Sequence, residues 1–436
     1  MLSLKTEENF KKILAWGICL LVFLLPWQTR LILKTGELAG NPWEYGTMSL
    51  YGLDILLAIL VLFGLEYFVN FVFEKIDFKK TLWIPCAVLF FVWVCVVNFL
   101  EADKLFALYW SIRFFLVLFF GIVVWSVKPK LKYISLALLS AGTIQAILAI
   151  WQFISQQVIG CKWLGMASQK GMDLGVSVIE IADERWLRAY GSFSHPNILA
   201  GFLVLAILAT TYLATNYKNP LKIKERYINP GYFNFFIPLL FIGLTLTFCR
   251  SAFVALVISL VALGIFIFIK NRHELEDFKK TSLVLVTCVI IFGIIFSSFA
   301  SQRIAVDSRL EQKSLDQRQS QFEVSSALIQ AKPILGYGVG NFTKAWHELD
   351  PNLSSWDYQP MHNVFLLILT ETGLIGLLLF LATLFFKVFQ NKAKVNRVQI
   401  FKFILLLAIL ILSFFDHYLW SFNSGLILWW LILGLV

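Results

Sequence analysis

The chain is dominated by apolar runs that are each about as long as a membrane's hydrocarbon core is thick. A helix rises about 1.5 Å per residue, so roughly 20 apolar residues cross a bilayer core of roughly 30 Å. Hydrophobic residues make up 59% of the 436 residues and charged residues only 15%, which excludes a soluble globular protein. The runs are expected at 13–33, 51–72, 82–100, 106–126, 133–154, 197–215, 232–249, 251–269, 281–299, 362–387, 402–416 and 419–436.

These runs are rich in Leu, Phe and Ile, and none alternates regularly between apolar and polar residues. Helices satisfy their backbone hydrogen bonds internally in lipid, whereas a barrel strand needs alternation. We therefore predict an all-α polytopic membrane protein of about 12 transmembrane helices, with 1–436 forming a single membrane domain. No small-residue cleavage pattern follows the first run, so we expect it to be retained as a helix.

The lysines and arginines predict how the helices are oriented. With the amino terminus in the cytoplasm, basic residues concentrate in short connections on that side, as the positive-inside rule requires. Both termini are then cytoplasmic, and two long loops, 155–196 and 300–361, lie outside. The basic residues behind the net charge of +10 therefore fix the orientation of the helices and contact anionic membrane lipid. We expect no nucleic-acid binding. Long outer loops are common carriers of function.

The second outer loop is expected to be partly helical. Residues 309–331 contain good helix formers and end before Pro333, which predicts a helix there. The segment ILGYGVGNF that follows is expected to be a glycine-rich turn, because no strand precedes it and no phosphate-binding lysine follows. Among the cysteines and histidines, no spacing typical of a metal site occurs.

Arg250 lies where the chain must turn abruptly. Residues 232–269 as one helix would be about 57 Å long, roughly twice the hydrocarbon thickness, so a turn is expected near residues 249–251. An arginine there has almost no loop to carry it into water. It needs an anion or backbone carbonyl groups as partners.

Arg188 and His362 also lie at the outer ends of spans. Arg188 precedes Pro196, a residue that suits a helix start. The alternative role of Arg188 is to extend its side chain toward lipid headgroups. His362 follows Pro360 at the start of the tenth span. The alternative interpretation of His362 is a histidine at the membrane interface with its hydrogen bonds satisfied. A helix amino terminus favours phosphate and disfavours imidazolium. A neutral imidazole there can accept a proton from a hydroxyl while arginines hold a diphosphate leaving group.

Four segments carry a family resemblance: RAYGSFSHPNILAGFLVL, LTFCRSAFVALVISL, RQSQFEVSSALIQAKPILGYGVGNF and HNVFLLILTETGLIGLLLFL. In this order, within roughly 185–390, they resemble the successive motifs of the O-antigen ligase and polymerase superfamily. The resemblance implies a bacterial inner-membrane glycosyltransferase with a GT-C-like fold, acting on the periplasmic side. It implies a glycan donor linked to undecaprenyl diphosphate, and neither a metal nor another cofactor.

The resemblance also assigns residues. Arg188 and Arg250 match the diphosphate-binding arginines, His362 matches the histidine proposed as general base, and Arg318 matches an arginine of the large outer loop. The sequence departs from the common pattern at Cys249, where Ser or Gly is usual, and at His195, where a small polar residue is frequent. Neither change removes a proposed functional group.

Further candidates rest on weaker signals. His195 is either a second acid or base, or a hydrogen-bonded turn histidine. Asn363 adjoins His362, and His417, after Asp416 at an outer helix end, could line the acceptor entrance. Arg113 lies within a span, and the ordinary explanation is that it pairs with the other intramembrane charge, Glu371.

Three function classes remain open. A ligase would transfer a finished glycan to an acceptor such as another glycan, a lipid A-core or a protein, and a polymerase would join lipid-linked repeats. Both use the same donor, so the sequence does not separate them. A transporter usually gathers its binding groups at the membrane midplane, whereas the candidates here lie outside, which disfavours transport.

Overall fold

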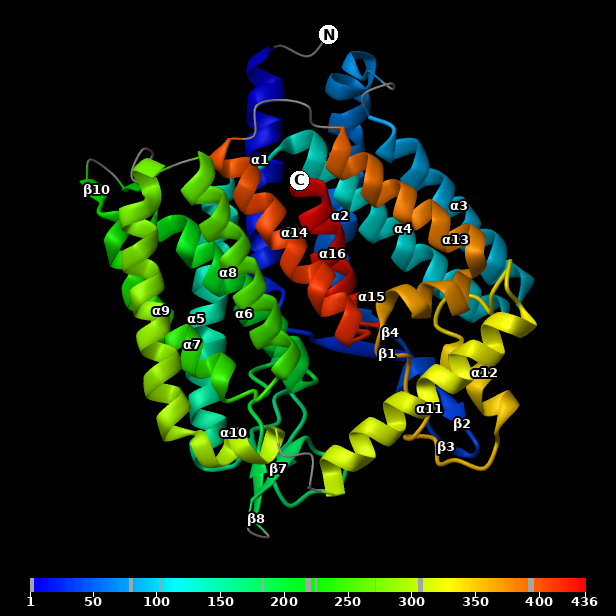
Figure 1. The fold of residues 1–436 in the computed structure, drawn as a ribbon. Coiled ribbons are helices and arrows are strands. Elements are labelled where there is room, and N and C mark those ends of the chain that lie inside the picture. Colours follow the sequence, from blue (N-terminus) through cyan, green and yellow to red (C-terminus); the bar gives the residue numbers. More distant parts are fainter. Residues whose placement is uncertain are drawn as a thin grey trace.

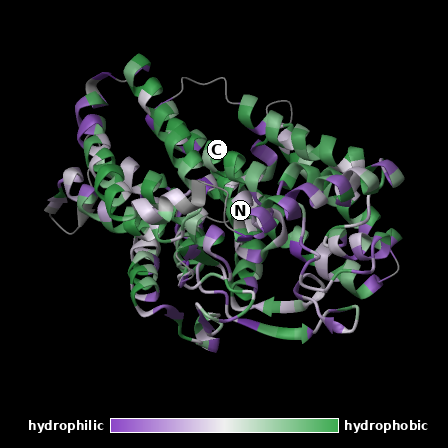
Figure 2. Ribbon diagram, turned by 60° about the horizontal axis from the view of Figure 1, so that its bottom comes forward, coloured by the Kyte–Doolittle hydropathy of each residue, from purple (hydrophilic) through white to green (hydrophobic). Residues whose placement is uncertain are grey.

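Long apolar helices run between the two ends of the molecule (Figure 1), and most of their length is hydrophobic (Figure 2). The computed structural model describes residues 4–77, 81–101, 103–181, 184–215, 221–223, 226–270, 272–304, 309–390 and 396–436. In this part of the chain, nine helices are long and apolar enough to cross a membrane, which confirms a polytopic helical protein. They are α2 (Gly52–Tyr67, continued in tighter and wider turns to Lys75), α3 (Trp83–Leu100), α4 (Lys104–Val127), α5 (Leu131–Ser155), α6 (Pro196–Ala214), α8 (Arg250–Lys270), α9 (Leu275–Ile295), α13 (Val364–Phe389) and α14 (Arg397–Phe415).

The other three expected spans each overlap a helix that is shorter or more charged. Helix α1 (Leu4–Leu24) carries charged side chains in its first half, while α7 (Phe236–Thr245) and α16 (Asn423–Leu435) have only 10 and 13 residues. A bilayer crossing takes about 20 helical residues. Twelve crossings and the GT-C-like arrangement therefore stay predictions.

Small two-stranded antiparallel sheets, which the prediction of an all-α protein did not include, add to a mostly helical chain. The first expected span was also too long: α1 ends at Leu24, and the apolar residues 31–33 belong to a strand. A short apolar run at a helix exit fits a strand as well as a helix. The paired strands are β1 (Arg30–Lys34) with β4 (Met48–Tyr51), β2 (Glu37–Leu38) with β3 (Asn41–Pro42), β5 (Gln157–Val158) with β6 (Gln169–Lys170), β7 (Val178–Ile181) with β8 (Glu184–Leu187), and β9 (Leu221–Ile223) with β10 (Arg226–Ile228).

The strands β1 to β8 and the short helices gather at one end of the molecule, opposite the end where the two termini lie (Figure 1). Segment 25–51 is thus a third long connection at this end, which sequence reasoning had missed. Helix α11 runs from Arg309 to Ala331 and confirms the predicted helix at its predicted bounds. The remaining short helices are α10 (Ser297–Ile304), α12 (Phe342–Leu349) and α15 (Tyr418–Ser421).

The turn between α7 and α8 lies where the length argument required it. Helix α7 ends at Thr245, Phe248 has a left-handed backbone with φ of 49°, and α8 begins at Arg250. The prediction of a turn near residues 249–251 is confirmed. It fixes Arg250 at the first position of α8.

The glycine-rich turn after α11 docks onto a break in α13. Gly373 has φ of 66° inside α13, and the carbonyl groups exposed by this break accept hydrogen bonds from the turn. The Gly338 N–H donates to Glu371 O over 2.8 Å, and the Leu374 N–H donates to Pro333 O over 2.9 Å. The break and the turn together fix α11 beside the start of α13.

Candidate functional site

Three ionisable side chains gather where two long helices end. His362 lies just before α13, and Asp416 and His417 lie just after α14. One ligand atom from each of the three lies within 4.8 Å of the others. The rings of His362 and His417 meet edge to face with centroids 4.9 Å apart. Side chains far apart in the sequence therefore form one cluster.

Neighbouring side chains orient both imidazoles. Gln321 of α11 places its Oε1 atom 2.9 Å from Nδ1 of His362, and the His362 N–H donates to the same oxygen over 3.2 Å. An amide oxygen only accepts hydrogen bonds, so Nδ1 of His362 carries a proton and Nε2 keeps its lone pair. Nδ1 of His417 lies 2.6 Å from the Ser421 hydroxyl.

Asn197 connects this cluster to Arg188. The Asn197 amide donates to Oδ2 of Asp416 over 2.7 Å, and its own Oδ1 accepts from the Arg188 guanidinium over 2.7 Å. Nε of Arg188 also donates to Thr247 O over 2.7 Å, in the turn before Arg250. A continuous hydrogen-bonded path thus runs from the turn between α7 and α8 to Asp416.

Burial and mutual charge set the protonation of the cluster. Burial lowers the pKa of His362; the Asp416 carboxylate opposes this effect and the Arg318 guanidinium adds to it. Burial likewise lowers the pKa of His417, to about 3. Burial would raise the pKa of Asp416, but the nearby imidazoles and the Asn197 hydrogen bond lower it to about 2. Near neutral pH the cluster holds an ionised carboxylate beside neutral imidazoles.

His195 is held by two hydrogen bonds at the start of α6. Its Nδ1 accepts from the Asn197 N–H over 3.1 Å, and Nε2 lies 3.1 Å from the Ser177 hydroxyl. Since Nδ1 accepts, Nε2 carries the proton and donates to Ser177. These contacts fit the alternative of a turn histidine, which also caps the helix.

Arg250 lies at the edge of an apolar groove between α7, α8 and α9. The groove has a volume of about 370 Å³, and Arg250 is an exposed residue of its lining. Thr245 is the other polar residue among those that line it. The aromatic residues of the lining are Phe241, Phe248, Phe253, Phe292 and Phe296.

Arg113 does not pair with Glu371, so that interpretation was wrong. Arg113 lies 3.4 Å from the Asp54 carboxylate and donates to Oδ1 of Asn423 over 2.9 Å. Glu371 instead accepts from the Trp420 indole over 2.7 Å. In the folded bundle the side chains of Arg113 and Glu371 each contact another residue, and the order of charged residues along the sequence does not predict these contacts.

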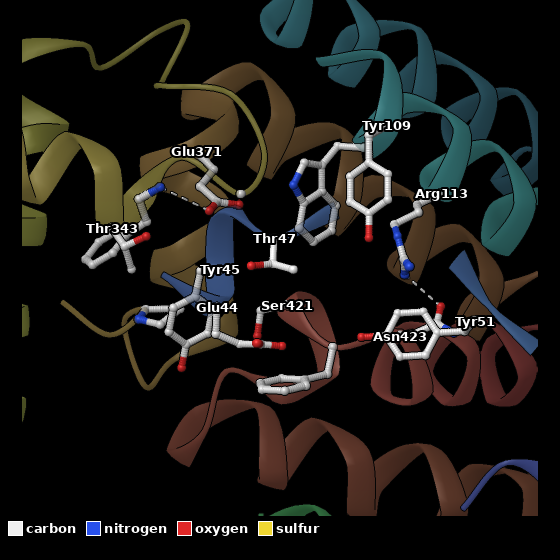
Figure 3. A pocket seen from close by; sticks show the side chains of 15 residues that line it. Glu44, Tyr45, Thr47, Tyr51, Tyr109, Arg113, Thr343, Glu371, Ser421 and Asn423 are labelled. Atoms are coloured by element: carbon white, nitrogen blue, oxygen red, sulfur yellow. Dashed lines mark hydrogen bonds between the residues drawn. The ribbon is translucent and has the colours of Figure 1, made fainter. Parts of the chain in front are cut away.

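Arg113 and Glu371 nevertheless line the same pocket, from different sides (Figure 3). Ser421 also lines this pocket and contacts His417, so the pocket adjoins the histidine cluster. Tyr45 packs edge-on against His417, with ring centroids 5.9 Å apart. The other aromatic residues of the lining are Tyr51, Tyr109, Trp110, Phe342 and Phe422.

Asn363 acts as a helix cap. Its Oδ1 accepts from the N–H groups of Phe365 and Leu366, at 3.0 and 3.1 Å, and its amide donates to Phe414 O over 3.3 Å. Capping satisfies otherwise unpaired N–H groups at a helix start and contributes about 1 kcal/mol. Asn363 therefore fixes the start of α13, next to His362.

A metal could in principle be held by His362, Asp416 and His417, the one such group among the described residues. Zinc bonds nitrogen and oxygen at about 2.0–2.2 Å, so its ligand atoms lie about 3.3–3.5 Å apart in a tetrahedral site. The spread of up to 4.8 Å is wider than this. Both Asp416 oxygens also accept N–H groups, from His417 and Asn197. The group as arranged fits hydrogen bonding better than zinc ligation.

Sequence reasoning noted Asp416 with His417 at an outer helix end, and Asn197 with Pro196 at a helix start, but it did not predict that Asn197 and Asp416 touch. It missed Gln321 entirely. Gln321 carried no sequence signal beyond its place in the expected helix 309–331. Arg318, one turn before Gln321, faces the cluster closely enough to lower the pKa of His362.

The fold and the site define a multi-pass membrane protein with a polar cluster where its helices end at one face. Residues 235–381 match the family model described as O-antigen ligase. This match supports the resemblance to the O-antigen ligase superfamily that the motifs predicted, and the members of that family are membrane glycosyltransferase-like enzymes of polysaccharide biosynthesis. No curated protein matches the chain. The matched region includes Arg250, Arg318 and His362 but not Arg188.

Proposed function

We propose that the protein transfers a glycan from an undecaprenyl-diphosphate carrier to an acceptor hydroxyl, as an O-antigen ligase. The observation that carries this proposal is the His362 cluster, where an oriented neutral imidazole lies beside the Arg318 charge. In this reaction the acceptor oxygen attacks the anomeric carbon, and the bond from that carbon to the diphosphate breaks. The diphosphate leaves with the bonding electrons.

His362 is the proposed general base. Gln321 holds Nδ1, which leaves the Nε2 lone pair to take the proton of the acceptor hydroxyl. Asp416, close enough to raise the pKa of His362, stabilises the imidazolium formed in that step. A positioned base of this kind contributes about 10²- to 10⁴-fold to a rate.

The arginines are proposed to neutralise the diphosphate. Arg250 is the first residue of α8, and Arg318 lies on α11. Arg188 is buried, and it holds the turn before Arg250 through Thr247. Guanidinium groups bind phosphate oxygens in pairs, which favours arginine for this task.

The groove beside Arg250 supports a lipid-linked donor. Its lining is almost entirely apolar and largely aromatic, with one cation at its edge. A polyprenyl chain would be buried along Phe253 and Phe292 while its diphosphate meets Arg250. This combination suits a substrate with a long apolar tail and an anionic head.

The pocket lined by Arg113 and Glu371 supports an acceptor that carries sugar hydroxyls. The Trp110 indole N–H and the Asn423 amide line it and are buried, and within the described part of the chain neither N–H group has a hydrogen-bond partner. Buried donors without partners are costly, so a ligand with hydroxyl oxygens would stabilise them. The acceptor is therefore proposed to enter beside His417.

The orientation of the site is part of this proposal. The basic connections support a protein of the bacterial inner membrane with both termini in the cytoplasm, and in that orientation the His362 cluster would face the periplasm. We also propose that the reaction needs no metal, because the two arginines can neutralise the leaving group.

The deciding experiment measures release of undecaprenyl diphosphate from a purified lipid-linked glycan by the protein in proteoliposomes. Acceptor-dependent release by the wild type, with at least 100-fold less by His362→Ala and Arg250→Ala, is expected. His347→Ala and Arg309→Ala are matched controls, since these residues contact Tyr358 and Glu180 outside the cluster. Equal release by all variants would remove His362 and Arg250 from the mechanism.

The acceptor supplied in this assay separates the two transferase reactions. Transfer to a lipid A-core, to a free glycan or to a protein indicates a ligase. Transfer onto a second lipid-linked glycan indicates a polymerase.

A further inference from the structure

A second large pocket lies at the opposite end of the molecule from the histidine cluster, where α4 and α16 end and α5 and α14 begin (Figure 1). Its volume is about 590 Å³. The residues that line it are Val124, Trp125, Lys128, Pro129, Lys130, Leu131, Lys132, Tyr212, Val398, Gln399, Lys402, Gly434, Leu435 and Val436.

The side chains of this pocket are strongly basic. Four lysines line it, namely Lys128, Lys130, Lys132 and Lys402, and no Asp or Glu is among its described lining residues. The Lys128 ammonium also lies 5.9 Å from the centre of the Trp125 ring. Lysine ammonium groups that line one pocket repel one another unless an anion lies between them.

A fifth lysine lies fully buried behind the lining. Lys387 has 0% of its surface exposed, and its ammonium lies 4.3 Å from the Trp83 ring centre and 5.8 Å from that of Trp125. Its nitrogen has no hydrogen-bond partner in the described part of the chain. An ammonium buried without an anion is costly, so a negative charge in the adjacent pocket would stabilise it.

The start of α5 adds to the positive potential. Lys130 is its N-cap residue and makes no side-chain capping hydrogen bond. A 25-residue helix carries partial positive charge and unpaired N–H groups at its amino end. Pro129, Lys130 and Leu131 place that end at the pocket wall.

We propose that this pocket binds the phosphate headgroup of an anionic membrane phospholipid from the leaflet at this end. The lysines and the α5 amino end contact the phosphate. Leu131, Val398 and Leu435 provide apolar lining for the start of the acyl chains. This position at the ends of membrane helices favours a lipid over a soluble phosphate. The inference does not depend on the proposed transferase reaction.

The test is lipid binding by the full-length protein in detergent, measured by native mass spectrometry with phosphatidylglycerol and phosphatidylcholine. The wild type is expected to bind phosphatidylglycerol at least tenfold more tightly. In Lys128→Gln/Lys402→Gln this preference is expected to disappear, whereas Lys128→Arg/Lys402→Arg keeps it. The control Lys279→Gln/Lys280→Gln removes two exposed lysines that pair with Glu276 and Asp277, and it should keep the preference.

Two results would overturn the proposal. Equal binding of both lipids by the wild type would show that the pocket has no preference for anionic headgroups, whatever the variants do. Displacement of phosphatidylglycerol by millimolar inorganic phosphate would identify a soluble anion as the ligand. If the double glutamine variant fails to fold, Lys128→Gln alone, at an exposed position, is expected to lower the preference several-fold.

Discussion

The Asn197 side-chain amide donates a hydrogen bond to the Asp416 carboxylate over 2.7 Å, and its Oδ1 accepts a hydrogen bond from the Arg188 guanidinium, also over 2.7 Å. The Asn197 side chain thus bridges a cation and an anion. It also ties the start of α6 to the end of α14. The Asn197 hydrogen bond adds to the effect of His362 and His417, which lower the pKa of the buried Asp416 carboxyl more strongly.

The charges around His362 predict opposite pH effects for two substitutions. The base acts when neutral, so activity is lost as pH falls through the pKa of His362. Asp416 raises that pKa and Arg318 lowers it. Asp416→Asn should therefore extend activity to lower pH, and Arg318→Gln should move the acid limb to higher pH, each by roughly one pH unit.

The measurement is the pH profile of glycan transfer for each variant, normalised to its own maximum. Gln319→Ala, an exposed change on the same helix, is the control and should leave the profile in place. Shifts of both variants in the same direction would contradict the assignment of His362 as the titrating base.

The hydrogen-bonded arrangement of His362, Asp416 and His417 predicts that metal removal has no effect. Transfer should continue at an unchanged rate in excess chelator, and elemental analysis of the purified protein should find no stoichiometric zinc. Loss of activity in chelator, restored by a divalent cation in the wild type but not in His417→Ala, would instead make these residues metal ligands.

Gly373 predicts a stability effect at the break in α13. Its φ of 66° disfavours any other residue, and a Cβ there would overlap the Ile334 carbonyl group of the docked turn. Gly373→Ala should destabilise the protein by at least about 1–3 kcal/mol, measured as a lower thermal midpoint in detergent. Gly293→Ala is the matched control, since a Cβ there meets nothing within 4 Å. An unchanged midpoint for Gly373→Ala would contradict the docking of the turn.

The buried pair of Arg113 and Asp54 predicts a non-additive effect. Asp54→Asn leaves the Arg113 charge without its carboxylate and should cost about 3–5 kcal/mol. Adding Arg113→Met should recover a large part of that loss, because both charges are then gone. Glu276→Gln, which breaks an exposed pair with Lys279, should have no measurable effect. Equal and additive losses for Asp54→Asn and Arg113→Met would show that the pair is not coupled.

The sequence by itself determined the membrane class, the resemblance to the O-antigen ligase superfamily and several local structures. Apolar length predicts spans because a bilayer has a fixed thickness, and it also required the turn before Arg250. Helix formers followed by a proline predicted α11, because proline cannot continue a helix. These properties depend on residues that are neighbours in the chain.

Only the tertiary structure decided which distant side chains meet. Asn197, Gln321 and Asp416 join His362 from three different helices, and their contacts depend on how those helices pack. For the same reason Arg113 found Asp54 instead of Glu371. The strand at residues 30–34 also depends on the tertiary structure. A short apolar run can form a helix or a strand, and here pairing with β4 makes it a strand.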